Sequence, residues 1–252
     1  MGVSFASMNY SRTNWRVKNL LSILAIGIFG AELTASAADI TGIITLKGKP
    51  PAETDLGPYI SANPDCAMMY QGKKMPTTLF YVVGPNGEFA DVVVSLPGVT
   101  GKSTGAGAPP AVLDQKDCLY TPQILAIQTG QKITVKNSDM CIHNVHSVPA
   151  APGNEEHNDV QMSGAADLTY TFAKPEMFLK FECNVHPWMK AWVSVFDSPY
   201  FSVSDKNGKF VIKNVPPGKY TVEANHRKLG AQTQDVEVAD KDVTVNFAFT
   251  VK

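Results

Sequence analysis

The chain has 252 residues, of which 44% are hydrophobic and 18% are charged, a composition typical of globular proteins with one or two packed cores. Its 22 lysines and arginines nearly balance its 23 aspartates and glutamates, which gives a formal net charge of -1. A chain of this charge lacks the cationic field that binds nucleic acid or anionic lipid, so composition excludes both as partners. The 19 glycines and 17 prolines suit many tight turns and favour an all-β fold.

The first 37 residues have the pattern of a secretory signal peptide. Basic residues up to Lys18 precede an apolar run at 20–29, and small residues at the end of this segment offer a cleavage point after Ala37. The run is shorter than the roughly 20 apolar residues that a membrane-spanning helix needs. We therefore expect a protein exported to the periplasm or beyond, with no membrane span after cleavage; an uncleaved anchor is the alternative.

From residue 38 onward the sequence alternates short strand patterns with turn residues. Valine, isoleucine, threonine and aromatic residues alternate with polar ones in short segments, and the clearest strands are predicted at 40–46, 79–83, 91–96, 132–136 and 168–172. Two stretches rich in proline and glycine, 47–76 and 98–110, are predicted to be irregular. Many short strands between turns, without a persuasive helical period, predict a β-sandwich.

The composition changes near residues 197–199, and a second group of strands follows. Strands are predicted at 200–204, 209–213, 220–224 and 243–249, and the Asn-Gly pair at 207–208 is a strong hairpin signal. The pattern Asp-x-Asn-Gly-x-Phe-x-Ile-x-x-Val-Pro-Pro-Gly-x-Tyr-x-Val-x-Ala resembles the transthyretin-like module of carboxypeptidase regulatory domains. This resemblance implies that 198–252 is a small β-sandwich without catalytic residues, serving as a scaffold or docking module.

Several cysteines, histidines and methionines cluster at the ends of predicted strands. Cys183, His186 and Met189 fall within seven residues of one another, and His143 and His146 follow another strand upstream. A thiolate, two imidazoles and a weak thioether form the donor set of a blue-copper site. Sulfur suits Cu(I) and nitrogen suits Cu(II), so this set serves an ion that alternates between the two states.

The motif Cys-x-x-His-Pro-Trp-Met-Lys, preceded some forty residues upstream by His-Asn-Val-His, resembles the type 1 blue copper proteins, the cupredoxins. Its ligand spacing is most similar to that of amicyanin, and the likeness covers roughly residues 132–196. The resemblance implies a Greek-key β-sandwich over 38–197, including an N-terminal extension. It also implies a carrier of single electrons, not an enzyme, whose redox protein partners are of the dehydrogenase or c-type cytochrome class.

Carried over position by position, the resemblance implies that one copper ion is held by His143, Cys183, His186 and Met189. It also implies that Asn144 hydrogen-bonds across the ligand loop and that electrons pass through the edge of His186. On an extended strand, a residue three positions beyond His143 points to the opposite face, so we expect His146 to lie outside the metal site.

These residues also fit functions other than a copper site. Cys183 could form half of a disulfide, because four cysteines permit three pairings in an exported chain. Zinc could bind the cysteine and histidines, although a thioether is a poor zinc ligand. The main alternative function is a periplasmic carrier or store of Cu(I) that undergoes no redox cycle, and another is a structural envelope protein with a vestigial site.

The remaining cysteines and histidines receive separate predictions. Pairing Cys66 with Cys118 would close a loop of about 50 residues and stabilise the fold by roughly 4 kcal/mol, so this disulfide is the preferred assignment. Cys141 lies two residues before His143, on the same face of an extended strand, and could be an extra soft donor, a buried thiol or an oxidised residue. His157 and Met162 are predicted to be solvated in a polar loop.

Overall fold

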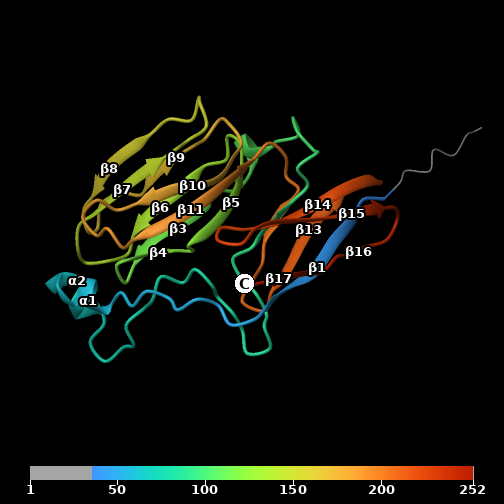
Figure 1. Cartoon of the computed structure of the whole chain (residues 1–252). Coiled ribbons are helices and arrows are strands. Elements are labelled where there is room, and N and C mark those ends of the chain that lie inside the picture. The colour runs from blue at the N-terminus through green and yellow to red at the C-terminus, as the bar shows by residue number, and fades with distance from the viewer. Residues whose placement is uncertain (1–35, 252) are drawn as a thin grey trace, which may run out of the picture. The chain divides into compact units, whose positions relative to one another are not determined.

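The computed structural model describes residues 36–251, and two β-sandwiches make up most of this part of the chain (Figure 1). The all-β prediction is confirmed, and both sandwiches belong to one compact unit. The predicted signal peptide lies outside the described residues except for its last two positions. Within the described residues, no helix is long and apolar enough to cross a membrane.

The first sandwich contains the predicted copper motif and is built from two sheets. One sheet has the strand order β5-β11-β10-β7-β8 and the other β4-β3-β6-β9. Alternate residues of the strands face inward, as Leu179 and Phe181 of β10 do, and they pack with Tyr120 and Phe172 in one core. The strands are β3 (Ala111–Lys116), β4 (Leu119–Thr121), β5 (Ile124–Gln128), β6 (Ile133–Asn137), β7 (His143–Val148), β8 (His157–Gln161), β9 (Leu168–Tyr170), β10 (Glu176–Glu182) and β11 (Lys190–Phe196).

The second sandwich has its own core and combines the C-terminal strands with two strands from the N-terminal half. One sheet has the order β13-β1-β16, with β17 also paired to β1, and the other has the order β12-β2-β14-β15. The strands are β1 (Ala38–Lys47), β2 (Val93–Ser95), β12 (Phe201–Val203), β13 (Lys209–Val215), β14 (Gly218–His226), β15 (Gly230–Val238), β16 (Val243–Thr244) and β17 (Phe247–Thr250).

The placement of β1 and β2 differs from the predicted domain limits, which assigned all of 38–197 to the copper-binding domain. β1 pairs antiparallel with β13 and parallel with β17, and β2 lies between β12 and β14. The physical reason is burial, because Ile40 and Ile44 on the inner face of β1 pack in the same core as Phe210 and Phe247. Residues 198–252 alone would leave that apolar surface uncovered.

The predicted Asn-Gly turn joins β12 to β13 and fits closely against β1. Gly208 has a φ of +70°, and its N–H donates to the Asp205 carbonyl at 2.8 Å. A Cβ at this position would lie 2.3 Å from the Ile44 carbonyl oxygen. Glycine is therefore required here both by the backbone angle and by the close approach of β1.

Several local predictions were wrong. The stretch predicted to be irregular at 47–76 contains two short helices, α1 (Gly57–Ser61) and α2 (Pro64–Met69), and the loop at 98–110 contains one 3-10 turn, Gly105–Gly107. Asn63 caps α2 by accepting the Cys66 N–H at 3.2 Å. The strand predicted at 79–83 does not form, because Leu79 adopts a φ of +51° and only Val83 makes an isolated bridge.

Candidate metal centre

Three of the predicted copper ligands meet at one end of the first sandwich. His143 and His186 face each other with their Nδ1 atoms 3.0 Å apart, and the Cys183 sulfur lies 3.9 Å from Nδ1 of His186. One donor atom from each of the three residues lies within 4.8 Å of the others. All three side chains are almost completely buried, so this donor cluster is shielded from water.

Two strands and one tight loop place these side chains. His143 is the first residue of β7, which pairs antiparallel with β10, and Cys183 follows the last residue of β10. The loop from Cys183 to Met189 is closed by two backbone hydrogen bonds, from Met189 N–H to the His186 carbonyl at 2.8 Å and from Cys183 N–H to the Met189 carbonyl at 3.3 Å. Met189 is fully buried in the same core, directly before β11.

The surroundings of Cys183 favour a thiolate. Its sulfur accepts the backbone N–H of Asn144 at 3.3 Å and that of His186 at 3.4 Å. Burial opposes the charged form, but the imidazoles of His143 and His186 together with these backbone donors outweigh it and lower the pKa of Cys183 to about 6. The thiolate, which is the metal-binding form of cysteine, is therefore stabilised before any ion binds.

Asn144 has the position that the sequence predicted for it. Its side-chain oxygen accepts the Asn184 N–H at 3.1 Å, and its side-chain nitrogen donates to Asn158 at 2.7 Å. The residue thus ties the ligand loop to β7 and β8 while its backbone donates to Cys183. These contacts hold the thiolate strand against the strand that carries His143.

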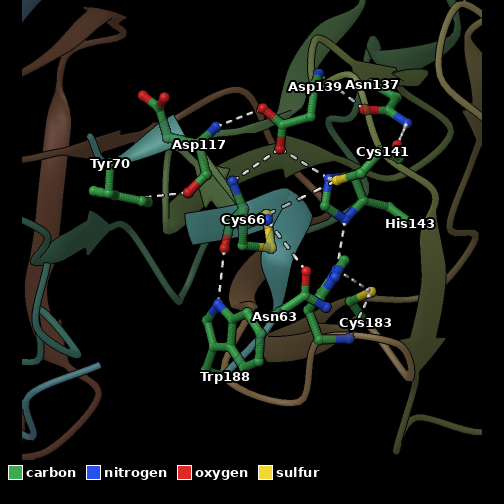
Figure 2. Close-up of a disulfide and its surroundings, with 12 residues drawn as sticks. Asn63, Cys66, Tyr70, Asp117, Asn137, Asp139, Cys141, His143, Cys183 and Trp188 are labelled. Carbon is green, nitrogen blue, oxygen red and sulfur yellow. Dashed lines mark hydrogen bonds and ion pairs between the residues drawn. A yellow bond between two sulfur atoms is a disulfide. The ribbon is translucent and has the colours of Figure 1, made fainter. Parts of the chain in front are cut away.

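Asp139 is a residue of the site that the sequence reasoning missed. Its carboxylate contacts Nε2 of His143 at 2.8 Å and accepts the backbone N–H groups of Asp117 at 2.7 Å and Cys118 at 2.8 Å (Figure 2). The carboxylate thus orients the ring through Nε2 of His143, and Nδ1 is the ring nitrogen that faces His186 and would bind a metal ion.

The same carboxylate affects the protonation of the imidazole. Burial lowers the pKa of His143, but the hydrogen bonds and charges of Asp139 and Cys183 more than compensate, and the net pKa is raised above its ordinary value. The available sequence signal was an acidic residue four positions before the first histidine ligand, in the loop between two strands. That spacing becomes meaningful only when the loop bends back toward the ring.

The predicted Cys66–Cys118 disulfide is present, with the two Cα atoms 5.8 Å apart. It links α2 to the turn between β3 and β4, where Asp117 and Cys118 both have positive φ. Because Asp139 accepts both backbone N–H groups of that turn, the disulfide lies one contact away from the carboxylate that orients His143. Figure 2 shows this arrangement.

Of the possibilities left open for Cys141, the structure shows a buried free thiol. Its sulfur lies 3.5 Å from Nε2 of His143 and 3.9 Å from the sulfur of Cys118. It therefore contacts the opposite edge of the imidazole from the one that faces Cys183 and His186. Burial and the charge of Asp139 raise the pKa of Cys141 to about 11, so the group stays protonated near neutral pH.

The other two histidine predictions have different outcomes. His146 lies outside the donor cluster, as predicted, and its ring contacts Glu156 at 2.6 Å and Asn184 at 3.3 Å. The prediction of a solvated loop was wrong for His157, which begins β8 and stacks on Tyr170 with ring centroids 4.5 Å apart. This edge strand was not predicted because its residues are mostly polar and most of them are exposed.

Comparisons with known proteins show similarity in both parts of the chain. The carboxypeptidase regulatory-like domain family matches residues 186–251, whereas the comparison with curated proteins finds no match. Among solved structures, an amicyanin variant in its Cu(I) state is similar over 40% of this chain and 97% of its own, at 22% identity and a TM-score of 0.31. A purple cupredoxin from Nitrosopumilus maritimus is similar over 34% of this chain and 98% of its own, at 23% identity and a TM-score of 0.29.

A copper-containing nitrite reductase from Thermus scotoductus SA-01 is also similar, over 36% of this chain, at 21% identity and a TM-score of 0.31. The chain covers only 24% of that enzyme's length. Both resemblances stated from the sequence recur in these matches, the regulatory-like domain at the C-terminal end and cupredoxins among the solved structures.

Proposed function

We propose that this chain is an exported protein that holds one copper ion and passes single electrons between redox proteins. In this proposal His143 and His186 hold the ion through Nδ1 and Cys183 through its sulfur, with Met189 as a weaker fourth donor. The observation that carries the proposal is the buried cluster of one donor atom each from His143, Cys183 and His186, all within 4.8 Å of one another.

The chemistry of the donor set fits copper. A thiolate and a thioether suit Cu(I), imidazole nitrogen suits Cu(II), and the thioether makes zinc a poorer match. When bound, copper supplies one-electron redox chemistry by alternating between these two states. The chain itself contributes a cysteine whose thiolate form is stabilised, Cys183, and a ring at His143 that Asp139 orients through Nε2.

The burial and fixation of these ligands favour electron transfer over substrate chemistry. His143, Cys183 and His186 are at most 1% exposed, and hydrogen bonds from Asn144 and to Asp139 restrain two of them. A rigid, dry donor set changes little between oxidation states, which lowers the cost of moving an electron. A small-molecule substrate has no direct access to the donor atoms, so we infer that this site does not act as an enzyme.

The proposed exit for electrons is the side of the loop next to His186. The Trp188 ring lies 5.1 Å from the His186 ring between centroids, and Pro187 beside it is exposed. A protein partner that contacts Pro187 and Trp188 would come near the imidazole without displacing any ligand. Such a partner would be of the dehydrogenase or c-type cytochrome class.

The experiment that tests this function is a Cu(II) titration of the full chain, followed by visible absorption and electron paramagnetic resonance. We expect one equivalent to produce an intense blue thiolate charge-transfer band with narrow copper hyperfine splitting. Cys183→Ala should abolish that band, and Cys141→Ala, a matched change of a second buried thiol, should retain it. A colourless product that releases Cu(I) readily to a chelator would reject the electron carrier and support the carrier of Cu(I).

A further inference from the structure

A cavity of about 1020 Å³ opens beside the ligand loop, separate from the donor cluster. Most of its lining comes from the segment around α1, the loop after His186 together with the start of β11, and the turn between β14 and β15. Thr78, Phe80 and Gln123 complete it. Its size suits a small organic molecule, and a large concave site with a few convergent polar groups is the usual form of a ligand pocket.

The walls of this cavity are rich in aromatic side chains. Tyr59, Phe80, Trp188 and Trp192 all line it, and Tyr59 is 55% exposed although it is a large aromatic residue. Flat rings offer large apolar surfaces and prefer to stack on other flat rings. The lining therefore fits a planar aromatic ligand better than a flexible aliphatic one.

The charges of the lining are all positive. Lys190, Arg227 and Lys228 line the cavity, and none of its lining residues in the described part of the chain is an aspartate or glutamate. In a chain whose overall charges balance, this local excess of positive charge is selective for an anion.

Arg227 is the cation best placed to bind that anion. Its guanidinium carbon lies 3.3 Å from the centroid of the Trp192 ring and 4.5 Å from that of Phe80, so aromatic faces hold the group in position. Among residues 36–251, no carboxylate lies within ion-pair distance of it and no hydrogen bond involves its side-chain nitrogens. Its in-plane N–H groups are thus available to a ligand.

The electrostatics of Arg227 agree with this geometry. Burial lowers the pKa of Arg227 to about 10, although Glu53 and Asp91 partly oppose the shift from a distance. The side chain remains charged at neutral pH. A half-buried cation without a paired anion is costly, and a carboxylate that enters the cavity would relieve that cost.

We propose that this cavity binds a planar aromatic carboxylate, whose ring packs against Tyr59 and Trp188 and whose carboxylate accepts hydrogen bonds from Arg227. The planar guanidinium fork matches a carboxylate in a bidentate arrangement, which a lysine cannot reproduce. The turn after β14 therefore contributes the recognition group, and the second sandwich has a direct part in ligand binding. The proposal does not depend on copper, because no donor atom of the metal cluster takes part.

Calorimetric titration of the metal-free full chain tests the proposal, with 2-naphthoate as the probe. We expect saturable binding of one equivalent. The neutral analogue 2-naphthalenemethanol tests the need for charge and cyclohexanecarboxylate tests the need for a flat ring, and each should bind at least about 10-fold more weakly. Equal affinity of the wild-type chain for the probe and either analogue would overturn the proposal without any variant.

Variants of the same chain identify the binding group. Arg227→Met keeps an apolar side chain but removes the guanidinium group, and it should weaken 2-naphthoate binding about 10-fold or more. Arg227→Lys should recover part of the loss, while Lys213→Met, an exposed cation of β13, should bind like the wild type. The absence of saturable heat in the wild type, or unchanged affinity in a folded Arg227→Met, would refute the assignment.

Cys183→Ala separates this proposal from the proposed function. It should lose the blue copper band and still bind 2-naphthoate with wild-type affinity. Loss of naphthoate binding in this variant, with its fold intact, would refute the independence of the cavity from the donor cluster.

Discussion

Replacing Asp139 by asparagine should destabilise the first sandwich strongly, although the two side chains have nearly the same shape. Asp139 is 6% exposed, and its carboxylate receives three hydrogen bonds, from the backbone N–H groups of Asp117 and Cys118 and from His143. An asparagine amide offers one accepting oxygen and one donating nitrogen. Whichever way the amide is turned, its NH₂ group faces at least one of these donors.

The size of the effect follows from those contacts. With the amide oxygen facing Cys118 and His143, the N–H of Asp117 loses its partner, which costs about 1–3 kcal/mol for a buried donor. The two retained bonds lose the charge that strengthened them, at about 1 kcal/mol each. We therefore expect a loss of about 3–5 kcal/mol in the free energy of unfolding of Asp139→Asn.

This loss should also depend on pH. The folded pKa of His143 is raised, so the stability contributed by its charged form is present below the ordinary histidine pKa and is lost as pH rises through the folded value. The difference between the wild type and Asp139→Asn should therefore be largest near pH 6 and smaller at pH 8. The pKa of His143 itself should fall in the variant, because burial remains while the neighbouring negative charge is gone.

Urea unfolding of the metal-free chain, with the disulfide intact, measures the stability loss. The fluorescence of Trp188 and Trp192, which lie in and next to the ligand loop, reports on the first sandwich. Asp117→Asn is the matched control, because that side chain makes only a partly exposed ion pair with Lys73 and should cost under about 1 kcal/mol. Equal losses in the two variants, or no loss in Asp139→Asn, would refute the reasoning.

Three further outcomes are expected of the metal-free protein. The lowered pKa of Cys183 gives stability that is present above the ordinary thiol pKa and is lost as pH falls toward about 6. Thiolate absorbance should therefore titrate near pH 6. The stability advantage of the wild type over Cys183→Ser should shrink as the pH falls over that range. Gly208→Ala should lower the unfolding free energy by more than about 2 kcal/mol, because its Cβ would meet a backbone carbonyl at 2.3 Å. Gly230 has a similar φ but open space around it, so the control Gly230→Ala should lower the unfolding free energy by only about 1 kcal/mol in thermal melting. A larger loss in Gly230→Ala than in Gly208→Ala would contradict the packing argument. Replacing Cys66 and Cys118 by alanine should cost about 4 kcal/mol in denaturant unfolding, since their disulfide spans 52 residues, and a loss below about 1 kcal/mol would contradict the chain-entropy estimate.

The sequence predicted those features of the site that depend on residues close together in the chain. The interval from Cys183 to Met189 lies on one loop, so the side chains must stay close whatever the rest of the chain does. Alternation along a strand likewise separated His146 from His143 correctly. The Cys66–Cys118 pairing followed once the other two cysteines were assigned near the metal motif.

What the sequence did not predict depends on contacts between distant segments. β1 carries an ordinary alternating pattern, and nothing in that pattern says that its partners are β13 and β17, more than 150 residues later. The cavity next to Trp188 needs α1 and the turn at Arg227 to come together, and neither segment has a motif of its own. Periodicity identifies a buried face, but the fold decides which surface covers it.

A series of direct contacts connects the disulfide to the donor cluster. The Cys66–Cys118 bond fixes the turn after β3, the backbone of that turn holds Asp139, and Asp139 holds the imidazole of His143. An oriented carboxylate is useful only if its own position is fixed, and here a covalent bond fixes it. Reduction of the disulfide should therefore disturb the His143 ring before it disturbs Cys183, whose restraints come from Asn144 and the ligand loop.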